Sequence, residues 1–117
     1  MGPTKASARR STVTPDSDLL ISDFADDEDV VDLVEEFVGT LSWRIEALRQ
    51  AFEENDLDTL TTTAHQLKGA GGRFGFTPIT DAARRLDDAA REKAGPETLE
   101  PLLMELIRLC LAARARA

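Results

Sequence analysis

One apolar stripe constrains the fold more than any other feature of this 117-residue chain. An α-helix has about 3.6 residues per turn, so apolar residues three or four positions apart share one face. Between residues 28 and 53 this spacing predicts an amphipathic helix that must bury its apolar face against other elements. Trp43 falls on the opposite side of this helix, and Leu33 falls at the edge of the stripe. The stripe consists of Val30, Val34, Phe37, Leu41, Ile45, Leu48 and Phe52.

Three further segments show helical spacing, and short turn signals separate them. Short connections between amphipathic helices favour antiparallel neighbours. We find neither an internal repeat nor the alternating polarity of a strand. The expected fold is therefore all-α, an antiparallel up-down four-helix bundle. The three segments cover about residues 57–75, 78–93 and 99–110, with Asp56, Thr77 and Thr98 as expected caps and Pro101 in the first turn of the last.

The N-terminal part of the chain divides into two regions. Residues 1–17 are basic, rich in Ser and Thr and without a periodic apolar face, so we expect a flexible leader. The segment from Asp18 to Phe24 predicts a short N-terminal helix that packs over one end of the bundle. The acidic cluster Asp26–Asp29 suits the start of the first long helix. The expected organisation is a leader, residues 1–17, and one domain, residues 18–117.

Composition narrows the possible function classes. The net charge of −8 argues against nucleic-acid binding by the folded domain. Cys110 is the only cysteine, which excludes an internal disulfide and a multi-cysteine zinc site, and its apolar neighbours predict a buried, inert thiol. We find no signal peptide and no apolar run of membrane-spanning length. The chain is therefore expected to be cytoplasmic and not to associate with membranes.

The run from His65 to Phe76 carries the densest functional signal. It contains the single histidine of the chain, with Lys68 three residues later and three glycines within the next seven positions. Each glycine costs a helix roughly 1 kcal/mol relative to alanine. Three so close together indicate that a partner or a neighbouring helix approaches the backbone.

His65 lies off the apolar stripe of its own helix, so its imidazole is expected at the surface. Residues three, four and seven positions away share its face, and four of the five are small. A lone histidine beside a lysine on a bare helical face suits reversible phosphorylation of the imidazole. These neighbours are Thr61, Thr62, Lys68, Gly69 and Gly72.

The sequence around His65 resembles the histidine-containing phosphotransfer (HPt) domain family. The resemblance covers about residues 18–115 and includes Thr63-Ala64 before the motif and Leu86-Asp87 after it. The family pattern is His-x-Leu-Lys-Gly, two small residues, two variable residues, an apolar residue and Gly. Here it is met by His65, Leu67, Lys68, Gly69, Ala70, Gly71, Phe74 and Gly75.

The resemblance implies a phosphocarrier. His65 would accept a phosphoryl group from a receiver-domain aspartate, or from a kinase such as a hybrid histidine kinase, and pass it to another receiver aspartate. Lys68 would stabilise the phosphate charge. The receiver would supply Mg²⁺ and most catalytic groups, so we expect a monomer that is not an enzyme and binds no metal or cofactor. Many members place a Gln or Glu near the histidine, whereas this chain has the shorter Asp87, which leaves open whether the side chain reaches the ring.

Several residues allow a structural or a functional interpretation. Gly71 points to the apolar stripe and indicates close helix packing, and Gly75 indicates a left-handed helix end. Receiver docking is expected at the bare face around His65, formed by Thr61, Thr62, Gly69 and Gly72, and at Leu20, Ile21 and Leu33. The alternative function is a scaffold module that binds receivers without transferring phosphate.

Overall fold

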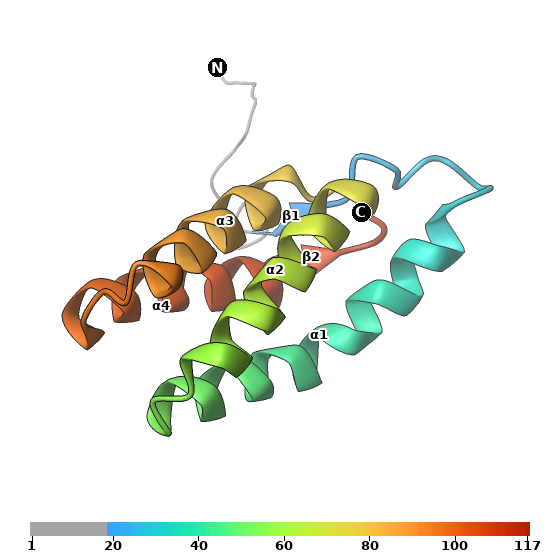
Figure 1. Ribbon diagram of the computed structural model, residues 1–117. Coiled ribbons are helices and arrows are strands. Elements are labelled where there is room, and N and C mark those ends of the chain that lie inside the picture. Colours follow the sequence, from blue (N-terminus) through green and yellow to red (C-terminus); the bar gives the residue numbers. More distant parts are fainter. Residues whose placement is uncertain (1–18) are drawn as a thin grey trace, which may run out of the picture.

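The computed structural model describes residues 19–117 as four helices and a short pair of strands (Figure 1). The chain reverses direction at each loop between helices (Figure 1). The prediction of an all-helical domain with four helices is confirmed, whereas the predicted leader lies outside the described residues. The elements are β1 (Leu20–Ile21), α1 (Val31–Glu53), α2 (Leu57–Arg73), α3 (Thr77–Arg91), α4 (Pro96–Ala112) and β2 (Ala113–Arg114).

The apolar stripe of α1 forms one wall of the core, as its spacing predicts. Only the ends of the stripe differ, because Val31 and Ala51 are buried while Val30 and Phe52 are half-buried. Cys110 on α4 is buried as expected, and burial raises the pKa of its thiol to about 12. This cysteine is therefore a core residue and not a reactive thiol.

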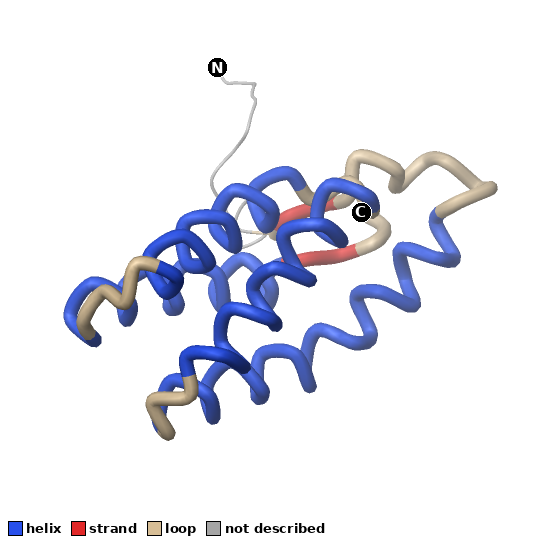
Figure 2. The backbone as a smooth tube through the Cα atoms, in the orientation of Figure 1, coloured by secondary structure: helices blue, strands red, loops and turns tan. Residues whose placement is uncertain are grey.

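The predicted N-terminal helix is wrong. Residues 20 and 21 instead form β1, which pairs in parallel with β2 (Figure 2). The next residues continue this attachment, since the Ser22 amide donates to the Arg114 carbonyl and the Asp23 amide to the Gly75 carbonyl, both at 2.9 Å. An isolated helix this short gains too few hydrogen bonds to offset its nucleation cost. Extended backbone is favoured because β2 and the loop between α2 and α3 satisfy its polar groups.

Three helix starts also differ from prediction. Helix α1 begins at Val31 because Asp27 accepts a hydrogen bond from the Asp29 amide (3.0 Å), which holds the acidic cluster in turns. The residue before α3 is Phe76, so Thr77 is its first helical residue and not its cap. Helix α4 begins at Pro96, which places Pro101 inside the helix. The exposed position of Pro101 lets solvent satisfy the carbonyl that its missing N–H leaves free.

Helices α2 and α3 make the most extensive contact in the domain, and Gly71 allows it. A Cβ at Gly71 would lie 2.7 Å from the Thr80 hydroxyl oxygen and 2.9 Å from the Thr80 amide nitrogen. That hydroxyl donates to the Lys68 carbonyl at 2.8 Å. The packing interpretation of Gly71 is therefore confirmed, and so is the left-handed conformation of Gly75, whose φ is +83°.

Alanine at two glycines of α2 should have opposite effects. Gly71→Ala should destabilise the domain by about 1–3 kcal/mol, because the added methyl overlaps the α3 backbone. Gly69→Ala should stabilise it by about 1 kcal/mol, since a Cβ there meets nothing within 4 Å. Urea unfolding of both variants tests this pair, and equal effects would contradict it.

Candidate functional site

His65 lies on the exposed side of α2, where 59% of its side chain is accessible to solvent. Its neighbours Ala64 and Leu67 are fully buried and anchor the helix to the core. The imidazole is therefore mounted on a rigid element while its ring remains accessible.

Polar side chains around the histidine lie next to a single buried carboxylate on α3. Asp87 is only 1% exposed, and its Oδ2 lies 3.5 Å from His65 Nδ1 and 3.6 Å from Lys68 Nζ. Its Oδ1 accepts a hydrogen bond of 2.8 Å from Arg91 Nε. A buried carboxylate is costly unless it is paired, and here two cations from two helices compensate its charge. The shorter side chain of Asp87 thus approaches the ring despite its departure from the family's Gln or Glu.

The position of Asp87 makes the two ring nitrogens of His65 unequal. A negative charge beside Nδ1 favours the neutral tautomer that carries its proton on that nitrogen. The lone pair then resides on Nε2, on the far side of the ring from Asp87. This arrangement can present a nucleophilic nitrogen away from α3.

A groove lies on the other side of His65, between α1 and α2. Its volume is about 470 Å³, and Gly69 leaves part of its wall bare, because a Cβ there would contact nothing within 4 Å. The groove is lined by Trp43, Arg44, His65, Gln66, Gly69, Ala70 and Arg73.

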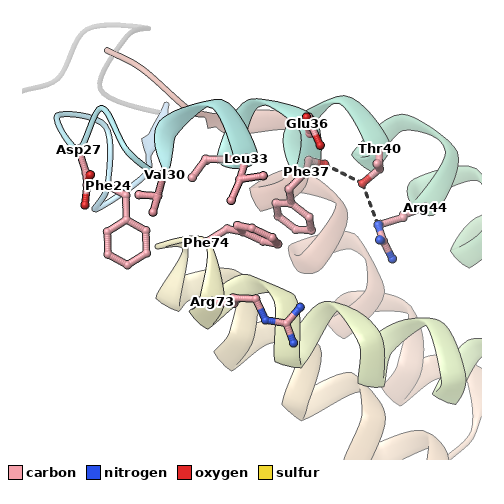
Figure 3. A pocket seen from close by; sticks show the side chains of 11 residues that line it. Phe24, Asp27, Val30, Leu33, Glu36, Phe37, Thr40, Arg44, Arg73 and Phe74 are labelled. Carbon is pink, nitrogen blue, oxygen red and sulfur yellow. Dashed lines mark hydrogen bonds between the residues drawn. The ribbon is translucent and has the colours of Figure 1, made fainter.

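An apolar cleft of about 550 Å³ adjoins this groove and shares Arg44 and Arg73 with it. Figure 3 shows the cleft between α1 and the end of α2. The rings of Phe37 and Phe74 stack in it with centroids 4.9 Å apart. The predicted docking residue Leu33 belongs to this cleft, whose lining is Phe24, Asp27, Val30, Leu33, Val34, Glu36, Phe37, Thr40, Arg44, Arg73 and Phe74.

The remaining predicted site residues are spread more widely. Thr62 and Gly72 are exposed on α2, and Thr61 is half-buried with its hydroxyl donating to the Leu57 carbonyl at 2.8 Å. Leu20 and Ile21 lie in the strand pair and line neither the groove nor the cleft. The structure thus gathers His65, Lys68, Gly69 and Asp87 and separates β1 from them.

Sequence reasoning missed Arg44, Arg73 and Arg91, and it assigned no function to Trp43. The i,i+4 spacing of Asp87 and Arg91 was a usable signal for their ion pair. Trp43 and Arg44 carry no such signal, because their place beside His65 depends on how α1 packs against α2.

Residues 19–117 contain neither a membrane-spanning helix nor a cluster of metal-binding side chains. No helix there is long and apolar enough to cross a membrane. No group of three or more His, Cys, Asp or Glu residues in that part of the chain could hold a metal ion.

Comparison with known families identifies the class of domain. The Hpt domain family matches residues 32–117, which is more than half of the chain. The chain therefore belongs to the Hpt domain family, whose members are histidine phosphotransfer modules of phosphorelays. Searches of curated proteins and of solved structures found no significant match.

Asp87→Ala should change the tautomer of His65. The native protein should show mainly the Nδ1–H tautomer in a two-bond ¹H–¹⁵N spectrum, and the variant should shift toward the Nε2–H tautomer because the carboxylate is gone. His65 is the only histidine, so its signals need no assignment. Asp88→Ala, at the exposed neighbouring position, is the control. An unchanged tautomer in Asp87→Ala would contradict the orienting role of Asp87.

Proposed function

We propose that this protein is a histidine phosphocarrier in a two-component phosphorelay. His65 accepts a phosphoryl group from a receiver aspartate, or from a kinase, and passes it to a receiver aspartate. The observation that carries the proposal is the pairing of an exposed imidazole with a buried carboxylate, in a chain that belongs to the Hpt family.

The transfer chemistry follows from this pairing. The Nε2 lone pair of neutral His65 attacks phosphorus, a P–N bond forms, and the P–O bond to the receiver aspartate breaks as that carboxylate leaves with the electron pair. The Nδ1 proton stays on the ring, so the phosphorylated imidazole carries a positive charge next to Asp87. In the second step a receiver carboxylate attacks phosphorus, and the P–N electrons return to Nε2.

Lys68 supports the same chemistry from one helical turn away. Its ammonium lies 3.6 Å from Asp87 Oδ2 on the side of the domain that carries the imidazole. Because a lysine three residues along the helix shares the face of His65, its flexible side chain can move from Asp87 to the oxygens of a phosphoryl group on His65 and neutralise part of their charge. We therefore assign Lys68 to charge stabilisation of the phosphorylated state.

The proposed partners are receiver domains, with a hybrid histidine kinase as the alternative source of the phosphoryl group. The receiver supplies Mg²⁺ to the transfer, and this chain acts as a monomeric carrier in the cytoplasm that binds no cofactor of its own. No nucleic-acid or membrane partner is proposed.

His65→Gln should abolish phosphorylation of this chain by a phosphorylated receiver. The label on the native protein should be acid-labile and base-stable, as expected for a P–N bond. Circular dichroism should remain helical, because the exposed side chain contributes little to the core. Retained labelling in His65→Gln would refute the assignment. Receiver binding by the native protein without any labelling would instead support the scaffold alternative.

Gly69→Gln should weaken transfer without unfolding the domain. The new side chain would stand one turn from His65, in the space that a receiver must occupy. Transfer rate should fall at least about tenfold while thermal stability holds or rises, since glycine is the poorer helix former. Normal transfer by the folded variant would show that the receiver does not approach over Gly69.

A further inference from the structure

We infer that Arg44 and Arg73 form a carboxylate-binding pair that fixes how a receiver docks on the α1 side of His65. The inference rests on the proposed phosphocarrier function and adds a specificity determinant to it. Both arginines line the groove that contains His65, and both also line the apolar cleft beside it.

The geometry of Arg44 prepares it to bind an anion. Its Nε donates a hydrogen bond of 2.9 Å to the Thr40 hydroxyl, and its guanidinium lies 4.7 Å from the Trp43 ring centroid and 5.8 Å from that of Phe37. These contacts fix the side chain and engage only Nε among its donors. The two terminal nitrogens have no hydrogen bond or ion pair within residues 19–117. A fixed guanidinium with free terminal N–H groups suits bidentate binding of a carboxylate.

Arg73 approaches the same space from α2. Arg73 lies four residues after Gly69 and lines the groove that contains His65, and its guanidinium lies 5.9 Å from the Phe74 ring centroid. Gly69 presents no side chain to obstruct it. Figure 3 shows the Arg44 guanidinium pointing from α1 toward α2, and the Arg73 guanidinium lying along α2. The bare glycine therefore leaves room for two cations beside the imidazole.

Charge complementarity identifies the occupant. Neither arginine forms an ion pair with a carboxylate in the described part of the chain, whereas Lys68 and Arg91 are both engaged by Asp87. A receiver that holds Mg²⁺ beside its phosphorylated aspartate is expected to carry an acidic surface there, because such Mg²⁺ sites are built from one or two carboxylates together with phosphate oxygens. This chain carries a net charge of −8 and would repel such a surface without local cations. Arg44 and Arg73 supply those cations next to His65.

The apolar cleft determines the orientation of the docked partner. Beyond the two arginines its lining becomes apolar, with Leu33, Phe37 and Phe74, and Asp27 lies near its far end (Figure 3). A carboxylate of the receiver is therefore favoured near His65, and an apolar side chain is favoured farther along α1. The arginine pair lies at the boundary between the groove and the cleft, because both arginines line both.

The test compares the double variant Arg44→Gln/Arg73→Gln with native protein and with the control Arg49→Gln. Arg49 is an exposed arginine on the same helix as Arg44 and lines neither the groove nor the cleft. Isolated receiver domains from the same genome are phosphorylated with Mg²⁺ present, and one that phosphorylates native protein serves as donor. The measurements are KM and kcat of transfer at low and high salt, the lifetime of phosphohistidine after receiver removal, and circular dichroism.

The double variant should raise KM for the receiver about tenfold at low salt, with a smaller difference at high salt and kcat within about twofold. Arg49→Gln should leave both constants close to native values. Unchanged KM in a folded double variant would overturn the inference while leaving the phosphocarrier function intact. A shortened phosphohistidine lifetime with unchanged KM would also overturn it, because the arginines would then act on the phosphoryl group. Failure of every receiver to phosphorylate native protein would instead refute the proposed function.

Discussion

The close approach of α2 and α3 at Gly71 is the contact on which the site depends. At this point the Thr80 hydroxyl hydrogen-bonds the Lys68 carbonyl, so the two backbones are fixed in register. Six residues back along α2 from Gly71 lead to His65, and seven residues forward along α3 from Thr80 lead to Asp87. Each helix rises about 1.5 Å per residue, so both side chains arrive at nearly the same level. The glycine thus acts on the chemistry through helix packing, without touching the imidazole.

The same packing brings the short side chain of Asp87 close to the imidazole. Gly71 lets α2 and α3 approach each other, and Asp87 Oδ2 lies 3.5 Å from His65 Nδ1. The close contact excludes solvent from Asp87, which makes an unpaired charge unfavourable. Lys68 from α2 and Arg91 from α3 compensate that charge. Ion pairing and orientation of the imidazole are therefore two consequences of one buried group.

The sequence predicted those features that local spacing determines. The α1 stripe, the cap at Asp56, the packing role of Gly71 and the left-handed Gly75 all follow from residue types at fixed intervals. The strand pair does not, because the partners of residues 20 and 21 lie more than ninety positions away and an apolar run looks helical without them. Local spacing could not predict the groove beside His65 either, since its two arginines come from different helices.

The two sides of the imidazole differ in charge, and this difference defines the site. On the α3 side, Lys68 and Arg91 are both engaged by the Asp87 carboxylate, so each cation there has a partner of opposite charge. On the α1 side, Arg44 and Arg73 face an open groove without a carboxylate from the described residues. A phosphocarrier needs such an asymmetry, because one ring nitrogen must be kept in place by the protein while the other reacts with partners that bind transiently. The compensated side can hold the ring in both states, and the uncompensated side gains its missing carboxylate only while a partner is bound.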